Sequence, residues 1–239
     1  MVGMTRDSLD ASDSIEVNSR EWLRPYFAPN PQSEIWRWWG WIGQQLLSQR
    51  FSGPDKLSTL EFGCGQAANV NFFHEQGLVS SGVDLNPDSI ETAKTRYLHL
   101  ASRLKVVPFH LDQGLFSPES FNQITSRHVL HFLPPEVFSQ SLSILRTWLK
   151  DRGILYVTFM QVGGYYFNNS VPLDNGMRRV QFNNGRFDRE VDVWFVNDEE
   201  DLKARFPDFH LIDLGESLDY FTRTEAPGDR YFCATFAAG

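Results

Sequence analysis

Residues 57–84, LSTLEFGCGQAANVNFFHEQGLVSSGVD, decide the fold of this chain. An apolar run ends at Phe62 and is followed by the glycine-rich turn Gly63-Cys64-Gly65. A helical pattern then covers residues 67–76, and a second apolar run ends on Asp84. Strand, glycine turn, helix and strand with a terminal acid are typical of half of a nucleotide-binding α/β unit. Glycine lets the backbone approach a ligand closely, and the N–H groups at a helix start bind polar or anionic groups.

Strands and helices continue to alternate after this unit. We expect helices over 87–102 and 134–149, and strands over 104–111, 121–126 and 154–159. Beyond residue 160 we expect an aromatic segment at 163–167, a hairpin turn at 183–185, a helix at 198–206 and strands at 210–214 and 231–236. The pattern predicts an α/β fold: a doubly wound, mainly parallel, seven-stranded Rossmann-like sheet with an antiparallel C-terminal strand.

The same pattern predicts one domain. Residues 1–14 are polar and are expected to form a disordered tail, and residues 15–239 form a single domain. Its parts are an N-terminal helical cap at 15–52, a cofactor-binding core at 57–160, a substrate lid or hairpin at 161–196, and a C-terminal helix with closing strands at 197–239.

Composition limits the kinds of partner that the chain is expected to bind. The chain has 239 residues, of which 41% are hydrophobic, so it can bury a full core. Its net charge of −8 disfavours binding to a nucleic-acid backbone. Neither a secretory leader nor an apolar run long enough to span a bilayer is visible. We therefore expect a soluble, cytoplasmic monomer or homodimer that binds neither nucleic acid nor membrane.

An aromatic helix is expected before the core, beginning near Ser33 and running to about residue 49. Ile35, Trp39, Ile42 and Leu46 have helical spacing and predict one buried stripe. Trp38 and Trp41 lie off that stripe. They are either ordinary core residues or aromatic rings that stack on a planar ligand.

Acidic residues around the glycine turn indicate which nucleotide it binds. Glu61 lies two residues before Gly63, where a carboxylate suits a cationic ligand better than a pyrophosphate. Asp84 is placed to accept hydrogen bonds from ribose hydroxyls. Asp112 follows the third strand, where it can accept a hydrogen bond from an adenine amino group.

With these residues, the chain resembles the class I S-adenosylmethionine-dependent methyltransferases. The family motif acid-x-Gly-x-Gly-x-Gly is similar to residues 61–67, with Ala67 in place of the third glycine. Asp84, Asp112 and the sequence Val129-Leu130-His131 match further family positions. The spacing is similar to the tellurite-resistance and thiopurine methyltransferase branch, which acts on small molecules. The resemblance covers residues 57–160 well, and the remainder in pattern only.

The resemblance implies roles for individual residues in binding S-adenosylmethionine, which leaves as S-adenosylhomocysteine. Gly63, Cys64 and Gly65 would border the methionine part through backbone groups, and Glu61 would orient its ammonium. Asp84 would hold the ribose. The remaining contacts would be Leu85 and Asn86 beside the adenine, Asp112 and Gln113 at its edge, and Arg127 near the methionine carboxylate.

Two histidines follow the fourth strand, where the transferable methyl should emerge. His128 or His131 could accept a proton from the methyl acceptor, because an imidazole titrates near neutral pH. Either could instead pack beneath the site as a structural residue. No third ligand follows at metal-binding spacing, so we predict no metal.

The acceptor is expected to be a small aromatic or apolar molecule, methylated on O, N or S. Trp38, Trp41, Tyr165 and Tyr166 could form an aromatic lid over it, although ordinary packing explains these residues equally well. Three alternatives stay open: an NAD(P)-dependent oxidoreductase, a cofactor-binding protein without catalysis, and a protein or RNA methyltransferase.

Overall fold

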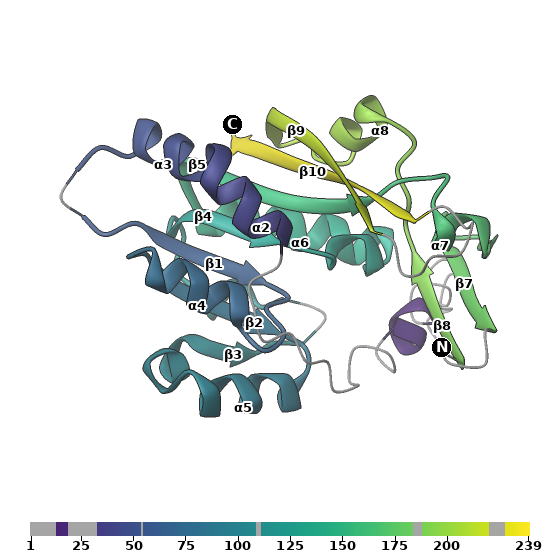
Figure 1. Ribbon diagram of the computed structural model, residues 1–239, viewed down its shortest axis with the longest axis horizontal. Helices are drawn as coiled ribbons and strands as arrows, with labels where there is room; N and C mark the ends of the chain where they lie inside the picture. The colour runs from purple at the N-terminus through teal and green to yellow at the C-terminus, as the bar shows by residue number, and fades with distance from the viewer. Residues whose placement is uncertain (1–12, 19–32, 54, 109–110, 184–187, 220–227) are drawn as a thin grey trace, which may run out of the picture.

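The structure of the protein is a computed structural model that describes residues 13–18, 33–53, 55–108, 111–183, 188–219 and 228–239 (Figure 1). The side chains of residues 181–189 are also outside the description. Most of the expected disordered tail and the tip of the expected hairpin therefore lie outside the described residues. Residues 13 and 14 of the expected tail belong instead to a short helix at 13–18.

A seven-stranded sheet forms the centre, with strand order β3-β2-β1-β4-β5-β10-β9. Its strands are β1 (Ser58–Phe62), β2 (Val79–Asp84), β3 (Leu104–Val106), β4 (Phe121–Ser126), β5 (Leu149–Met160), β9 (Phe209–Asp219) and β10 (Asp229–Ala238). Strands β1 to β5 are parallel to one another, and β10 is antiparallel to both β5 and β9. The predicted fold class is confirmed.

This topology brings distant strand ends to one edge of the sheet. The chain leaves β1 toward β2 on one side, while β4 lies on the other, so β1 and β4 form the switch point where open α/β sheets bind ligands. Tyr231 of β10 pairs with Met160 of β5, and Asp229 pairs with Asp219. The start of β10 and the end of β9 therefore lie at the same edge as the carboxyl ends of the parallel strands.

Helices cover both faces. They are α2 (Ser33–Trp38), the π-helix η1 (Trp39–Gly43), α3 (Gln44–Arg50), α4 (Ala68–Glu75), α5 (Pro87–Arg96), α6 (Pro135–Trp148) and α8 (Glu199–Ala204). In β5, Ile154 and Tyr156 pack with the N-terminal helices and α4, whereas Leu155 and Val157 pack with α6 and α8. Because side chains alternate along a strand, both faces of β5 are buried.

The N-terminal helix differs from its predicted pattern. Ile35 and Trp39 are buried as expected, and Ile42 and Leu46 are half-buried against the same core cluster, but Gly43 and Leu47 beside them are buried more completely. The π-helix explains the difference, since its wider turn adds one residue and shifts the buried stripe by one position.

Several strand boundaries also differ. The third strand was predicted over 104–111, but β3 ends at Val106. The strand predicted over 154–159 is longer, because β5 begins at Leu149 and accommodates Arg152 at φ 61°. The strand predicted over 210–214 is longer, since β9 continues to Asp219.

A second sheet of β6 (Ser170–Pro172), β7 (Arg178–Asn183) and β8 (Asp188–Val193) lies beyond the carboxyl ends of the main sheet (Figure 1). The fully buried Asp192 joins this sheet to the helix at 13–18. Its carboxylate accepts hydrogen bonds from Ser14 Oγ at 2.6 Å and from Arg179 Nε at 2.8 Å. Asn18 pairs with the backbone of Asp192 and donates to the carbonyl of Phe132.

Replacing Asp192 with Ala should lower the free energy of unfolding by about 2 kcal/mol, because among the described residues Arg179 keeps only the exposed Asp13 as a partner and Ser14 loses its buried acceptor. Urea unfolding measures this loss. Glu216→Gln is the matched control: Glu216 pairs with Arg230 at the surface, so the change should cost less than about 0.5 kcal/mol. Equal losses in the two variants would contradict a structural role for the buried pair.

Candidate functional site

The glycine turn after β1 is closed on one side and open on the other. Gly63 has φ 77°, and a Cβ there would lie 2.2 Å from Val129 Cγ2. Gly65 has φ 51°, and a Cβ there would meet no described atom within 4 Å. Ala67, at the third motif position, also adopts the left-handed conformation at φ 61°. The turn therefore packs tightly against the chain after β4 and leaves its other side free for a ligand.

Glu61 lies beneath this turn with one oxygen satisfied. Its Oε1 accepts a hydrogen bond of 2.6 Å from Asn69 Nδ2, while the buried Oε2 has no hydrogen-bond partner among the described residues. Burial raises the pKa of Glu61 to about 8, although Asn69 and Arg127 act to lower it. A buried carboxylate with a vacant acceptor fits a cationic donor such as the ammonium of S-adenosylmethionine.

Asp84 ends β2 and faces the turn. Its Oδ2 accepts a 2.6 Å hydrogen bond from the Gly65 N–H, and its Oδ1 accepts one of 2.8 Å from the Asn86 N–H. Burial raises the pKa of Asp84, while these two N–H groups act to lower it. Asn86, not Asp84, caps α5, because its side chain accepts from the N–H groups of Asp88 and Ser89. Each Asp84 oxygen keeps acceptor capacity for a ribose hydroxyl.

The other predicted cofactor residues have varied surroundings. The Cys64 side chain packs against Gly82, so only the backbone of Cys64 is available to a ligand. Leu85 is half-buried beside Asp84. Asp112 is exposed and its Oδ1 accepts from the Gly114 N–H, and Gln113 is exposed as well.

Arg127 has a protein partner that the sequence did not reveal. Its Nε and Nη2 donate to Oε2 and Oε1 of Glu34 at 2.9 and 3.1 Å, which ties the end of β4 to the first turn of α2. Burial acts to raise the pKa of Glu34, but Arg127 outweighs it and holds the pKa below its usual value. We call this pair of hydrogen bonds the Arg127–Glu34 fork. The guanidinium in it already binds one carboxylate through two N–H groups. A contact with the methionine carboxylate stays a prediction.

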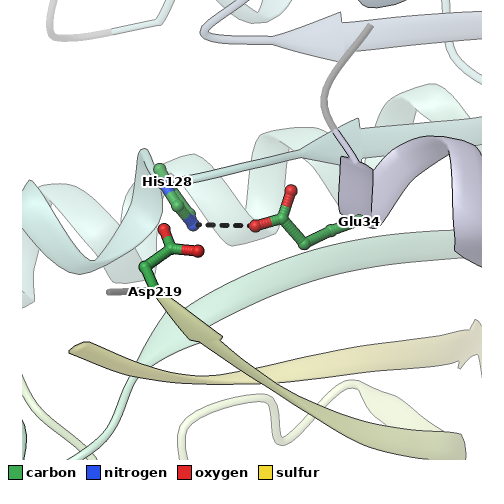
Figure 2. Close-up of side chains that lie close together, drawn as sticks. All are labelled: Glu34, His128 and Asp219. Atoms are coloured by element: carbon green, nitrogen blue, oxygen red, sulfur yellow. Dashed lines mark ion pairs between the residues drawn. The ribbon is translucent and has the colours of Figure 1, made fainter. Parts of the chain in front are cut away.

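His128 lies at the open end of this group. It has φ 53°, its N–H donates to Thr158 Oγ1 at 2.8 Å, and its ring stacks on Tyr231 with centroids 4.1 Å apart. The ring nitrogen Nε2 lies 4.0 Å from Glu34 Oε1, and Figure 2 shows Asp219 on its other side. Burial and then Arg127 hold the pKa of His128 well below its usual value, so the imidazole is neutral.

His131 is placed differently. It is fully buried and packs against Phe132, Phe159 and Tyr231. Burial lowers its pKa to about 3. These surroundings are those of a core residue beneath the site rather than of a group that exchanges protons with a ligand.

The sequence missed four residues near His128: Glu34, Asp219, Asp229 and Tyr231. Glu34, His128 and Asp219 each offer a ligand atom, and these atoms lie within 4.8 Å of one another (Figure 2). Asp229 Oδ1 accepts from the Tyr166 N–H at 2.8 Å, and its buried Oδ2 has no partner among the described residues. The available signal was that Asp219 and Asp229 border a polar connection between two strands.

The predicted aromatic lid is only partly brought to this site. Trp38 stacks on Tyr156 with centroids 4.4 Å apart, and its indole N–H donates to Thr235 Oγ1 at 2.8 Å, so its ring is committed to the core. Trp41 is 87% exposed. Tyr165 and Tyr166, in α7 (Tyr165–Asn168), are half-buried, and Tyr166 reaches the site through Asp229.

The sheet order is that of the Rossmann-like fold of solved methyltransferases. Residues 60–155 match the family model described as a methyltransferase domain. No curated protein sequence matches the chain. Of the described helices, none is long and apolar enough to cross a membrane.

Solved structures share the fold at low identity. An S-adenosylmethionine-dependent methyltransferase from Methanosarcina mazei is 16% identical with a TM-score of 0.64, covering 81% of this chain and 96% of its own. The PH0226 protein from Pyrococcus horikoshii is 14% identical with a TM-score of 0.62, covering 90% and 95%. A 1,6-didemethyltoxoflavin-N1-methyltransferase from Burkholderia thailandensis, with bound S-adenosylhomocysteine, is 14% identical with a TM-score of 0.57, covering 100% and 92%.

The chain thus contains a segment that matches a methyltransferase domain, and it shares its fold with S-adenosylmethionine-dependent methyltransferases. The unpartnered Glu61 Oε2 and the open side of Gly65 fit that cofactor. The narrower likeness to the thiopurine and tellurite-resistance branch stays a prediction.

Glu61 should make the free energy of unfolding depend on pH. Its pKa is about 8 in the folded chain against an ordinary value of 4.5, so the folded state binds more protons than the unfolded state between these values. The Glu61 contribution to stability therefore falls as pH rises through this window. Glu61→Gln keeps the acceptor for Asn69 but cannot ionise. The free energy of unfolding of the wild type, minus that of the variant, should decrease from about pH 4.5 to pH 8 in urea titrations. If the free energies of unfolding of the wild type and of Glu61→Gln changed equally with pH, the raised pKa of Glu61 would be contradicted.

Proposed function

We propose that this protein transfers the methyl group of S-adenosylmethionine to an O, N or S atom of a small molecule bound beside His128. The observation that carries the proposal is the paired arrangement of Glu61 and Asp84 around the glycine turn at the switch point of the sheet. Glu61 has a vacant buried acceptor for an ammonium, and Asp84 has acceptors for a ribose.

The residues of the chain act mainly by alignment. Bound S-adenosylmethionine supplies an electrophilic methyl group with a good leaving group, so holding donor and acceptor in line lowers the barrier. Glu61 and Asp84 fix the two ends of the cofactor. The contact of Gly63 with Val129 sets the chain after β4 against the turn, which brings His128 to the region where the acceptor must lie.

His128 is better suited than His131 to accept the acceptor proton. A neutral imidazole has a free lone pair, the Tyr231 stack orients the ring, and the hydrogen bond from the backbone N–H to Thr158 holds the main chain of His128. Its strained backbone supports a functional role, because such conformations persist where the surroundings hold them in place. His131 is enclosed by aromatic rings and supports the site by packing.

Two features support a small acceptor. The net charge of −8 disfavours nucleic acid, and the Burkholderia neighbour is named for a small molecule. An oxidoreductase using a nicotinamide dinucleotide is a weaker alternative, since Glu61 would place a carboxylate near the pyrophosphate. Stabilisation by NAD(P) in a thermal shift assay, without stabilisation by S-adenosylhomocysteine, would favour that alternative.

Asp84→Ala should weaken S-adenosylhomocysteine binding about 10- to 100-fold, which corresponds to ~1–3 kcal/mol for lost hydrogen bonds to a charged acceptor. Isothermal titration calorimetry gives the affinity. Glu91→Ala is the control, because Glu91 is an exposed acid on α5 that pairs with Lys94. An affinity in Asp84→Ala equal to that of the control would refute the ribose contact.

His128→Ala should lower kcat by about 10²-fold without a matching change in cofactor affinity, because it removes the proton acceptor. His131→Phe keeps an aromatic ring in the buried position and should retain kcat within about threefold, as near-isosteric core changes are tolerated. The measurement is steady-state turnover of a methyl acceptor across pH. Equal turnover in both variants and the wild type would leave alignment as the only contribution of this loop.

A further inference from the structure

The edge of the sheet beside His128 carries negative charge that the proposed reaction has not used. Asp219 ends β9 and Asp229 begins β10, and the two residues are direct partners across the antiparallel pair. Side chains of directly opposed residues point to the same face and lie close together, and like charges in such a pair repel. Burial raises the pKa of both carboxyl groups, that of Asp229 to about 6, and each group also feels nearby acids.

Neither carboxylate has an ion-pair partner among the described residues, although Arg127 acts to lower the pKa of Asp219. Among the described residues, the nearby guanidinium of Arg127 is held by both oxygens of Glu34, and no lysine or arginine forms an ion pair with Asp219 or Asp229. The buried Oδ2 of Asp229 and the buried Nε2 of His128 have no hydrogen-bond partner in the same set. Asp219, Asp229 and the His128 ring, which stacks on Tyr231 of β10, belong to one end of the sheet. Their vacant acceptors and negative charge favour a cationic donor bound among them.

We propose that Asp219 and Asp229 bind the ammonium group of a primary or secondary amine, and that this protein is an amine N-methyltransferase. This inference rests on the proposed function and gives its substrate class. Tyr231, whose ring stacks on His128, and Tyr166, whose N–H binds Asp229, border the carboxylates and supply apolar surface for the carbon skeleton of the amine.

The step balances with groups already present. The bound ammonium loses one proton to His128 Nε2, which passes it to solvent, and the nitrogen lone pair becomes free. The new C–N bond forms as the methyl–sulfur bond of S-adenosylmethionine breaks, and the products are S-adenosylhomocysteine and the N-methylated ammonium ion. Asp219, whose carboxylate lies within 4.8 Å of a ring nitrogen of His128, stabilises the imidazolium that forms transiently (Figure 2).

A metal ion is the competing occupant of the same carboxylates. Glu34, His128 and Asp219 have the spacing of a metal-ligand group. The Arg127–Glu34 fork argues against it, since it uses both oxygens of Glu34 and places a guanidinium about 3 Å from them. An ammonium needs only Asp219 and Asp229, which leaves the fork intact.

The test measures charge preference on the full chain saturated with S-adenosylhomocysteine. Butylamine, 2-phenylethylamine and tryptamine are titrated by calorimetry, each beside its alcohol and carboxylate analogue. The amines should bind at least tenfold more tightly than both analogues. Asp219→Asn should remove at least tenfold of the amine affinity, and Asp213→Asn, on the same strand, should not change it. Incubation with S-adenosylmethionine should then give the N-methylated amine by mass spectrometry.

Other outcomes would contradict either the amine assignment or the proposed function, and the two failures can be told apart. Alcohols or carboxylates that bind as well as the amines, amines that do not bind, or equal amine affinity in the wild type and Asp219→Asn would overturn the amine assignment. Mn²⁺ that binds to the wild type but not to Asp219→Asn would overturn it in favour of a metal site. Absence of S-adenosylhomocysteine binding in the first step would instead refute the proposed function.

Discussion

The close contact of Gly63 with Val129 is the constraint on which the site depends. Only a residue without a side chain can stand there, because a Cβ would lie 2.2 Å from Val129. The N–H groups of Gly63 and Cys64 also both donate to the Val83 carbonyl, so the same turn is bound to β2. The loop ends of β1, β2 and β4 are thereby held together, and His128, the neighbour of Val129, is placed next to the cofactor turn.

A second constraint is electrostatic and fixes the helical cap. The Arg127–Glu34 fork connects two elements that are 93 residues apart in the chain, and Trp38, one turn further along α2, is held by Tyr156 and Thr235. The cap is thus attached to the sheet by a charged pair at the site edge and by aromatic packing deeper in the core. The fork also neutralises Glu34, which leaves Asp219 and Asp229 as the carboxylates able to attract a ligand.

The structure around the glycine turn could be predicted because its signals are local. Glu61, Gly63, Gly65 and Asp84 lie within one strand–turn–helix–strand unit, where spacing fixes geometry. Glu34 and Asp219 could not be predicted, since tertiary pairing alone brings them to His128, from opposite ends of the chain. The spacing of hydrophobic residues does not show that a π-helix inserts one residue, and only the burial of Gly43 and Leu47 in the structure reveals it. His128 and His131 looked equivalent three residues apart, but burial separates them.

These placements change what selects the acceptor. The aromatic helix suggested recognition by stacked rings, yet the Trp38 ring packs in the core and Trp41 is exposed to solvent. Opposed acids at the β9–β10 end carry a folding cost, because like charges face each other in partly buried positions. Such a cost is retained most readily where a ligand relieves it. Binding of a cation, as proposed above, would account for both the acidic edge and the unpartnered Asp229 oxygen, whereas aromatic stacking would account for neither.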